Sequence, residues 1–300
     1  MEKTWTILDI ITWGKAYFEE RQIDSPRLTI ELLLSFALGK PRVYLYTAFD
    51  QPLTVKELSA LRSMVKRRGE REPLQYITGE AYFYDLRLEV SPATLIPRPE
   101  TELLADYAIR RLSAQRQDFD QSGESTDGEC AVLDIGTGSG CLGLAIAKRL
   151  PFVTLYGIDI SDEVLEIAAR NGAKVGATNV HWGKIDILRS APRRKFDAIV
   201  ANPPYIGVPD WEDLEPEVRL HEPRAALTDE SADGLRFYRR FAEIFPSTLK
   251  NGDSWFAVEM GYGQAEAVQR IFQGAGFQTV IINDLANIPR ICVGAREGLA

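Results

Sequence analysis

The chain has 300 residues, of which 45% are apolar and 26% are charged, with three cysteines and two histidines. This composition excludes a disordered, collagenous or disulfide-stapled protein, and a chain of this length is expected to form about two domains. No apolar run approaches the roughly 18 residues that cross a bilayer, and no secretory signal is present, so we expect a cytoplasmic protein with no membrane partner. The odd cysteine count, without a C-x-x-C pair, agrees with a reducing compartment.

The net charge of −8 is unevenly distributed. The first 75 residues hold 12 Lys and Arg against 10 Asp and Glu, and the other 225 hold 23 against 33. Because binding to a duplex through its phosphates needs a basic domain, we expect no stable nucleic-acid partner. A basic stripe does occur on one predicted helix, and we interpret it as a solvated face rather than as a contact for an acidic or RNA-rich partner. It consists of Lys56, Arg62, Lys66, Arg67, Arg68 and Arg71.

Residues 1–78 are predicted to form a small helical domain. Ser25 before Pro26 is typical of an N-cap followed by proline in the first helical position, and Thr54 with Glu57 forms a capping box. From residue 79 to 93 the apolar period changes to two, which predicts a β-hairpin linker. Residues 94–300 then form an α/β domain, in which we expect residues 116–129, rich in Asp, Gln, Ser and Gly, to be a surface loop.

Short apolar strands alternate with helices after this loop. Helices are expected to begin near Cys141 and Ser161 and to cover Phe237–Leu249 and the stretch up to Gly274. Such alternation predicts a parallel sheet covered on both faces, with ligands bound at the carboxyl ends of the strands. The predicted strands are 131–135, 153–158, 180–185, 196–201, 255–259, 279–283 and 290–294.

A glycine-rich loop follows the first of these strands. It runs Asp134-Ile135-Gly136-Thr137-Gly138-Ser139-Gly140, and its glycines allow the backbone to turn sharply and to approach a ligand closely. The spacing from Gly136, with the acid Asp134, is typical of S-adenosylmethionine binders, whose ligand carries an ammonium group that a carboxylate suits. Gly138, Gly140 and Gly143 also satisfy the G-x-G-x-x-G pattern of NAD and FAD binders, so an oxidoreductase is an alternative.

Two further acids end the next two strands. Asp159 lies 23 residues after Gly136, close to the spacing at which a carboxylate reaches ribose hydroxyls, although it could instead cap the following helix. Asp186 could accept a hydrogen bond from an adenine amine, with Ile187 flanking the ring, but an aspartate in a surface turn fits nearly as well.

The motif Asn202-Pro203-Pro204-Tyr205 follows the strand 196–201 and carries the predicted chemistry. A planar amide or aromatic amine is a poor nucleophile, so methyl transfer to it requires both N–H groups to be held by acceptors. The Asn202 side-chain oxygen and the Pro203 carbonyl can supply them, the prolines fix the backbone, and Tyr205 offers a flat face. Positioning then supplies most of the rate. With only two distant histidines and no cluster of ligands, no metal site is predicted.

These motifs resemble the PrmC/HemK family of release factor glutamine methyltransferases. The resemblance extends over nearly the whole chain, with matches at residues 69–79, at the string Leu-Ile-Pro-Arg-Pro-Glu-Thr-Glu at 95–102, and from 222–223 through 233–235. It implies a class I S-adenosylmethionine-dependent methyltransferase with a Rossmann-like seven-stranded sheet and a small N-terminal helical domain. One departure is Asn287, where a glycine is usual, although asparagine tolerates the same left-handed backbone.

The resemblance also implies the partners and the site. The methyl donor is expected to be S-adenosylmethionine, and the substrate the glutamine of the Gly-Gly-Gln motif in class 1 peptide chain release factors. Gly136 to Gly140, Asp159, Ile187 and Asn202 would contact the donor, and Asn202 to Tyr205 would hold the glutamine. Phe83 and Arg98 could line the site, or serve respectively in packing and in an ion pair with Glu100 or Glu102. We expect a monomer.

Four alternatives remain at this stage. A sister enzyme would methylate a glutamine of a large-subunit ribosomal protein, and an adenine amino-group DNA methyltransferase shares the Asn-Pro-Pro-Tyr motif. An NAD-dependent oxidoreductase would use the other glycine register. An inactive ribosome- or factor-binding module would use residues 1–75, but it would have no need of the glycine loop and Asn202.

Overall fold

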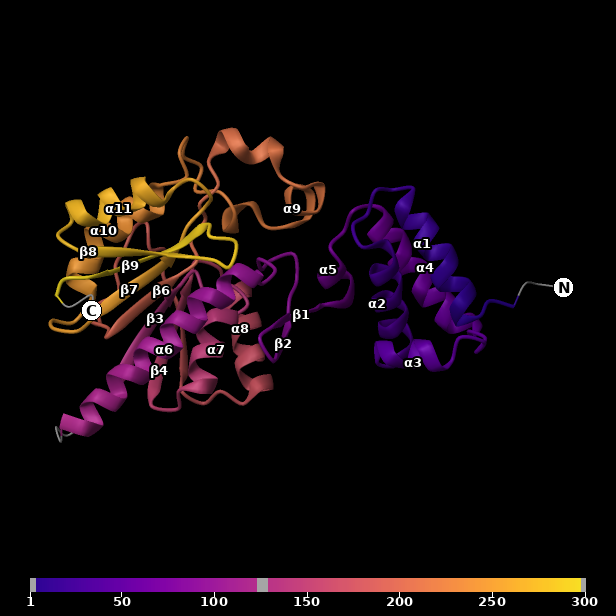
Figure 1. Cartoon of the computed structure of the whole chain (residues 1–300), viewed down its shortest axis with the longest axis horizontal. Helices are drawn as coiled ribbons and strands as arrows, with labels where there is room; N and C mark the ends of the chain where they lie inside the picture. Colours follow the sequence, from indigo (N-terminus) through magenta and orange to yellow (C-terminus); the bar gives the residue numbers. More distant parts are fainter. Residues whose placement is uncertain (1–3, 123–128, 298–300) are drawn as a thin grey trace. The chain divides into compact units, whose positions relative to one another are not determined.

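The computed structural model describes residues 4–122 and 129–297, except for the side chains of residues 119–122. Two compact units are present, and Figure 1 labels their helices and strands. The first unit comprises the chain up to Glu80 together with Glu215–His221, and the second comprises the rest. The hairpin therefore belongs to the second unit, and a short segment from the carboxyl-terminal half belongs to the first.

The first unit is helical. Thr54 and Glu57 form the expected capping box at the start of α4, and Thr6 with Asp9 forms another at the start of α1. Ser25 is the N-cap of α2 and Pro26 its first residue, as predicted, although Ser25 has a left-handed backbone (φ 48°) and its side chain makes no capping bond. The helices of this unit are α1 (Ile7–Glu19), α2 (Pro26–Leu38), α3 (Arg42–Thr47), α4 (Val55–Gly69), α5 (Leu74–Thr78) and α9 (Pro216–His221).

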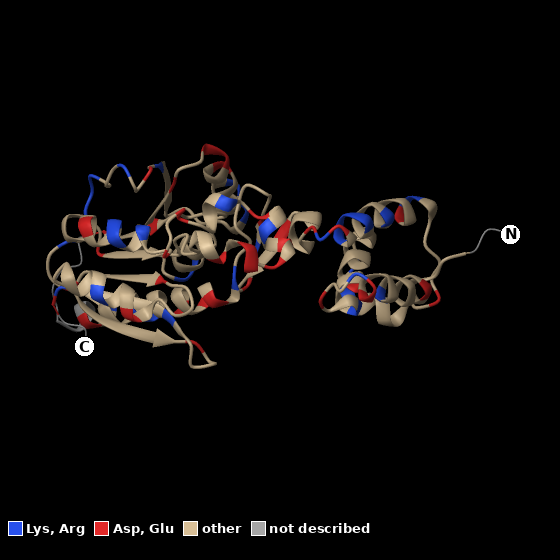
Figure 2. Ribbon diagram, turned by 90° about the horizontal axis from the view of Figure 1, so that it is seen from above, with Lys and Arg blue, Asp and Glu red and all other residues tan. Residues whose placement is uncertain are grey.

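Most of the basic stripe is engaged in ion pairs within this unit. Arg67 pairs with Glu72, and Arg68 and Arg71 both contact Glu217, at 3.1 and 3.2 Å. Figure 2 shows positive and negative residues interspersed in each unit. The stripe is thus largely neutralised by neighbouring carboxylates, which agrees with its interpretation as an ordinary solvated face.

The second unit contains a seven-stranded sheet in the order β5-β4-β3-β6-β7-β9-β8. The first five strands of this order are parallel, whereas β9 runs antiparallel to both β7 and β8, so the expectation of a parallel sheet was wrong at this edge. Only a short turn around Asn287 joins β8 to β9, and a connection this short can make only an antiparallel pair. The strands are β3 (Cys130–Ile135), β4 (Val153–Asp159), β5 (Val180–Lys184), β6 (Ala198–Ala201), β7 (Trp255–Glu259), β8 (Gln278–Asn283) and β9 (Pro289–Ala295).

Helices cover both faces of the sheet, as Figure 1 shows. On one face α6 (Pro99–Ser122) and α7 (Cys141–Arg149) pack against side chains such as Val132 and Val200, and α8 (Asp162–Val175) lies beside α7. On the other face α10 (Arg236–Thr248) and α11 (Ala265–Gly274) pack against Leu133 and Phe256. The two apolar faces alternate along each central strand, as the period of two requires.

Helix α6 is longer than predicted. Its residues up to Ser122 are helical, so the expected surface loop over 116–129 was wrong for residues 116–122, and residues 123–128 lie outside the described part. Gln and Arg are good helix formers, and polar residues on the exposed side of a helix carry no loop signal. Gln115 is anchored to β7, because its side chain accepts a bond from the Trp255 indole at 2.9 Å.

The hairpin of β1 (Glu80–Phe83) and β2 (Leu86–Glu89) packs into the core of the second unit, and a buried asparagine binds the end of β2. The Asn171 side chain in α8 accepts from the Glu89 amide at 2.7 Å and donates to the Glu89 carbonyl at 2.9 Å. It also donates to the Ser139 carbonyl at 2.9 Å. Asn171 therefore connects the hairpin to the glycine loop.

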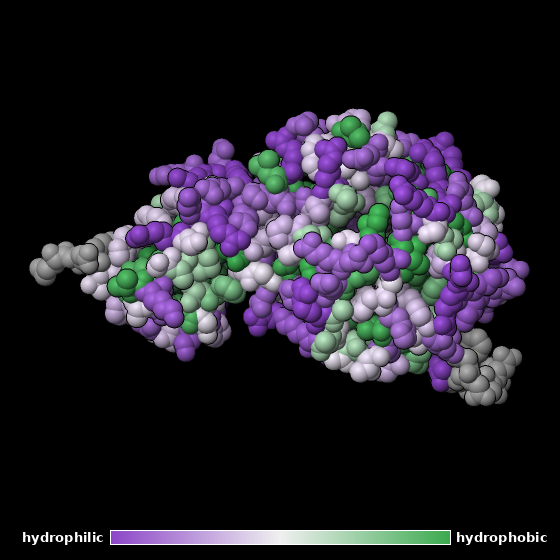
Figure 3. Space-filling model, turned by 180° about the vertical axis from the view of Figure 1, so that it is seen from behind, coloured by the Kyte–Doolittle hydropathy of each residue, from purple (hydrophilic) through white to green (hydrophobic). Residues whose placement is uncertain are grey.

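The face of the molecule drawn in Figure 3 is mainly hydrophilic, with separate hydrophobic patches. None of the described helices is both long enough and apolar enough to cross a membrane. Within residues 4–122 and 129–297, no three His, Cys, Asp or Glu side chains are grouped so that they could hold a metal ion.

Replacing Asn171 by Ala is expected to lower the free energy of unfolding by about 2–3 kcal/mol, because it leaves a buried amide and two carbonyls without their partner. Urea unfolding measures the change. The exposed Asn283→Ala is the control and should change stability by less than about 0.5 kcal/mol. An equal effect of the two substitutions would contradict the anchoring role of Asn171.

Candidate functional site

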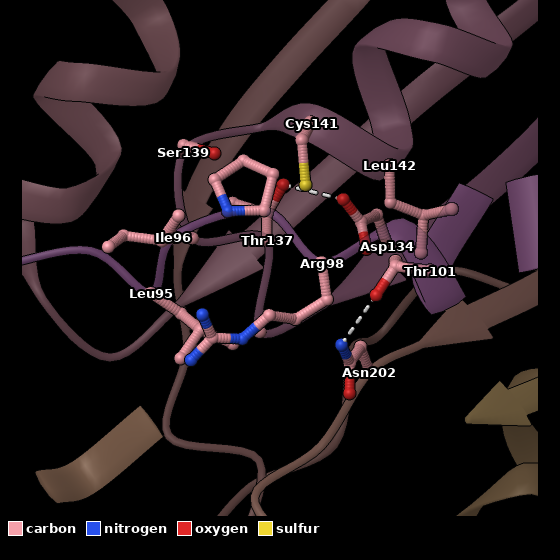
Figure 4. A pocket seen from close by; sticks show the side chains of 13 residues that line it. Leu95, Ile96, Arg98, Thr101, Asp134, Thr137, Ser139, Cys141, Leu142 and Asn202 are labelled. Carbon is pink, nitrogen blue, oxygen red and sulfur yellow. Dashed lines mark hydrogen bonds between the residues drawn. The ribbon is translucent and has the colours of Figure 1, made fainter. Parts of the chain in front are cut away.

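A pocket at the carboxyl end of β3 is lined by most of the glycine loop and by Asn202, the first residue of the second predicted motif (Figure 4). Its walls come from three segments: the stretch that leads into the first turn of α6, the glycine loop with the start of α7, and the first residue after β6. The lining residues are Leu95, Ile96, Pro97, Arg98, Thr101, Asp134, Gly136, Thr137, Gly138, Ser139, Cys141, Leu142 and Asn202. Of the other predicted site residues, the lining does not include Gly140, Asp159, Asp186, Ile187, Pro203, Pro204 or Tyr205.

The glycine loop turns around a buried carboxylate. Asp134 is 1% exposed and accepts a bond from the Thr137 hydroxyl at 2.6 Å. Burial raises the pKa of Asp134 to about 7, against the opposing effect of its hydrogen bonds to Thr137 and to the Gly143 amide. Gly138 has a φ of 56°, which an L side chain adopts only with strain.

Ser139 is the second polar group of this loop. It is 1% exposed, and its hydroxyl has no hydrogen-bond partner among the described residues. Buried hydroxyls are nearly always hydrogen-bonded, so a lone one in a pocket wall points to a ligand that completes it.

Asp159 ends β4 beside the glycine loop. Its carboxylate accepts from the amides of Gly138 at 3.2 Å, Ile160 at 2.8 Å and Ser161 at 3.2 Å. Ser161 itself caps α8, because its side chain accepts from the Val164 amide. A carboxylate has about four acceptor positions, so Asp159 retains capacity for a further donor such as a ribose hydroxyl. Burial raises its pKa.

Asp186 and Ile187 are placed differently from the other candidates. The Asp186 carboxylate accepts from the Leu188 amide at 3.0 Å and pairs with Arg189 at 3.2 Å, so it forms the surface turn considered above. Ile187 is 6% exposed and packs in the hydrophobic core beside α10. Contacts of these two residues with an adenine ring remain predictions.

The Asn202-Pro203-Pro204-Tyr205 motif leaves the sheet at the end of β6 and is held by the chain that follows. Ile206 pairs with Thr228 in a short parallel bridge, and the Tyr205 carbonyl accepts from the Gln264 side chain at 2.9 Å. Gly234 lies against this carbonyl with a φ of 65°, and a Cβ atom there would stand 2.0 Å from the oxygen. Gly234 is therefore required for the path of the backbone through the motif.

The side chain of Asn202 belongs to a chain of hydrogen bonds that sequence patterns did not reveal (Figure 4). Its Nδ2 donates to the Thr101 Oγ1 at 2.9 Å, and this hydroxyl donates to the Glu259 Oε2 at 2.7 Å. Glu259 is 2% exposed, and burial raises its pKa to about 7. The Tyr205 hydroxyl lies 3.5 Å from the other oxygen of Glu259, and burial with this nearby carboxylate raises the pKa of the tyrosine.

Arg98 and Phe83 also occupy definite places. Arg98 lines the pocket, but its guanidinium pairs at 2.6 Å with Glu222 and not with Glu100 or Glu102, so that part of the expectation was wrong. Glu222 is buried and also accepts from the Ile96 amide at 3.2 Å, which ties this stretch to the loop after the motif. Phe83 is 1% exposed and packs in the hydrophobic core.

Sequence analysis missed Thr101, Glu222 and Glu259 as site residues. Thr101 lies inside the string at 95–102, which was recognised only as a family motif. Glu259 ends a predicted strand, and the rule that ligands gather at the carboxyl ends of parallel strands could have selected it. Glu222 likewise lies in a segment that was recognised only as part of the family resemblance.

Two family models match the chain. The model described as "PrmC N-terminal domain" matches residues 9–79, and that described as "Methyltransferase domain" matches residues 126–232. Among solved structures, the hMettl16 catalytic domain covers 81% of this chain and 82% of its own with a TM-score of 0.53. Its 12% identity shows a common fold only. The predicted methyltransferase fold with a helical N-terminal domain is confirmed.

Curated relatives agree over the full length. A "Release factor glutamine methyltransferase" of Geobacter sulfurreducens is 42% identical over 98% of this chain and 98% of its own. One of Bacillus subtilis is 36% identical over 93% of this chain and 94% of its own. The resemblance seen in the motifs is thereby confirmed, and the chain belongs to the family of release factor glutamine methyltransferases.

Proposed function

We propose that this protein transfers a methyl group from S-adenosylmethionine to the side-chain amide nitrogen of the glutamine in the Gly-Gly-Gln motif of class 1 release factors. The observation that carries the proposal is that Asn202 and the glycine loop Asp134–Ser139 line one pocket. An acceptor for a carboxamide thus lies beside the loop expected to hold the donor. The names of the curated relatives support the choice of substrate.

The residues of the pocket fit the donor. The carboxylate of Asp134 suits its ammonium group, and the unpartnered hydroxyl of Ser139 can complete a hydrogen bond with it. The remaining acceptor capacity of Asp159 suits a ribose hydroxyl. When bound, S-adenosylmethionine supplies an electrophilic methyl group.

The protein's own contribution to the reaction is positional. The Asn202 Oδ1 accepts one N–H of the glutamine amide and the Pro203 carbonyl accepts the other, so that the nitrogen is held with its weak lone pair toward the electrophile. Tyr205 offers a flat face for the carboxamide plane. The extra proton of the methylated nitrogen then passes to solvent water, and no strongly basic residue is needed. Holding both reactants in line can lower a barrier by about 7 kcal/mol or more.

Two other aspects remain predictions: the protein acts in the cytoplasm and as a monomer. An adenine methyltransferase is not favoured, because the relatives that match over the whole chain are named for release factor glutamine and because the basic stripe is neutralised. The family result likewise does not favour an oxidoreductase.

Asn202→Ala is expected to reduce methyl transfer to a purified release factor about 100- to 1000-fold, because one of two acceptors is lost. Transfer of a labelled methyl group, with mass spectrometry of the Gly-Gly-Gln peptide, measures the effect. The exposed Asn251→Ala is the control and should retain full activity. If wild-type enzyme modified a large-subunit ribosomal protein or a bare oligonucleotide instead of any release factor, the proposed substrate would be wrong.

We expect the affinity of the pocket for the amino acid part of S-adenosylmethionine, which carries the ammonium group, to decrease as the pH is lowered. Only the ionised form of Asp134 attracts an ammonium group. Because the pKa of Asp134 is about 7, the ionised fraction of this residue decreases from about nine-tenths at pH 8 to about one-tenth at pH 6. Calorimetry with S-adenosylhomocysteine should show about tenfold weaker binding at pH 6 than at pH 8.

The variant Asp134→Asn tests whether Asp134, rather than another titrating group such as Glu259, causes the pH dependence of binding. It should bind S-adenosylhomocysteine weakly and with little pH dependence, whereas the exposed Asp253→Asn should behave as the wild type. An unchanged pH dependence in Asp134→Asn would show that another group is responsible.

A further inference from the structure

We infer that Thr101 and Glu259 are positioning residues that set which end of the Asn202 carboxamide faces the substrate. The inference rests on the proposed function, since it explains how the acceptor for the glutamine amide is kept in place. Thr101 lines the pocket, but in the proposed mechanism neither of the two side chains binds a reactant.

The direction of the hydrogen bonds follows from the chemistry of the three groups. A hydroxyl has a single proton, and the buried Glu259 carboxylate, when ionised, can only accept. While Glu259 is ionised, Thr101 therefore directs its proton to the Glu259 Oε2, at 2.7 Å, and can only accept from its other side. The group that donates to it, at 2.9 Å, is the Nδ2 of Asn202.

The orientation of the Asn202 carboxamide follows directly. With Nδ2 turned to Thr101, Oδ1 is turned away from it, as Figure 4 shows. A carboxamide rotated by 180° would present N–H groups to the substrate, and these would repel the N–H groups of a glutamine amide. The rotated form would also leave the buried Thr101 hydroxyl without its donor, which is unfavourable.

The backbone of these residues is held by regular structure. Thr101 is 2% exposed in the first turn of α6, Asn202 directly follows β6, and Glu259 is the last residue of the neighbouring strand β7. The register pairs Ala201 with Val258, so Asn202 and Glu259 follow paired positions of adjacent strands. The Glu259 carbonyl also accepts from the buried Tyr238 hydroxyl at 2.9 Å. The orientation is thus imposed by the sheet rather than by a mobile loop.

Thr101→Val removes the hydroxyl and preserves the shape of the side chain. It is expected to lower kcat for release factor about 10- to 100-fold, because a misoriented acceptor misplaces the nitrogen. Binding of S-adenosylhomocysteine should stay within about twofold, and Thr101→Ser should restore kcat. Thr248→Val, which removes a buried hydroxyl bonded to helix α10, is the matched control and should retain kcat. Thr101→Ala replaces the valine variant if the latter does not fold.

A second measurement does not depend on activity. In ¹H–¹⁵N spectra, the side-chain amide of Asn202, assigned by its loss in Asn202→Ala, should be protected from exchange in wild type and Thr101→Ser and exposed in Thr101→Val. Unchanged protection and unchanged kcat in Thr101→Val would overturn the inference while leaving the proposed function intact. Absence of transfer by the wild type would contradict the proposed function, and the amide spectra would still decide the positioning role.

Discussion

The parallel pairing of β3, β6 and β7 is the constraint on which the site depends. Ile135 pairs with Ala201, and Ala201 with Val258, so the three strands end at one edge of the sheet. The glycine loop, Asn202 and Glu259 therefore meet although they are far apart in the sequence. A shift of register by one residue would send every side chain of a strand to the opposite face, and the two apolar faces covered by α6 and α10 exclude such a shift.

Much of the fold could be predicted because its signals are local. Continuous apolar runs identified the strands, and the Thr54–Glu57 capping box marked the start of α4. Asn287 has the left-handed backbone (φ 61°) that was expected where a glycine is usual. Where prediction failed, the local signal was weak: polar residues at 116–122 suit an exposed helix as well as a loop.

The site was predicted only as far as its residues stand in consecutive motifs. The hydrogen bonds that orient them join distant positions: Arg98 is separated from Glu222 by 124 residues, and Thr101 from Glu259 by 158. No spacing rule connects such pairs, because their meeting depends on sheet order and on the angle at which α6 begins. An ion pair of Arg98 with a near neighbour such as Glu100 was expected. Its side chain instead pairs with Glu222, the buried carboxylate that also accepts from the Ile96 amide.

The two buried carboxyl groups of this edge illustrate how binding capacity is gained at the expense of stability. Burial raises the pKa of Asp134 and of Glu259 to about 7, above the values of an unfolded chain. Their contribution to stability is therefore complete below about pH 4, where both states are protonated, and is lost as the pH rises through about 7. At neutral pH the hydrogen bonds of these carboxylates thus offset only part of the free-energy cost of burying their charge. An ammonium group bound beside Asp134 would restore part of that loss, so the same desolvation that weakens the free protein strengthens its attraction for a cation.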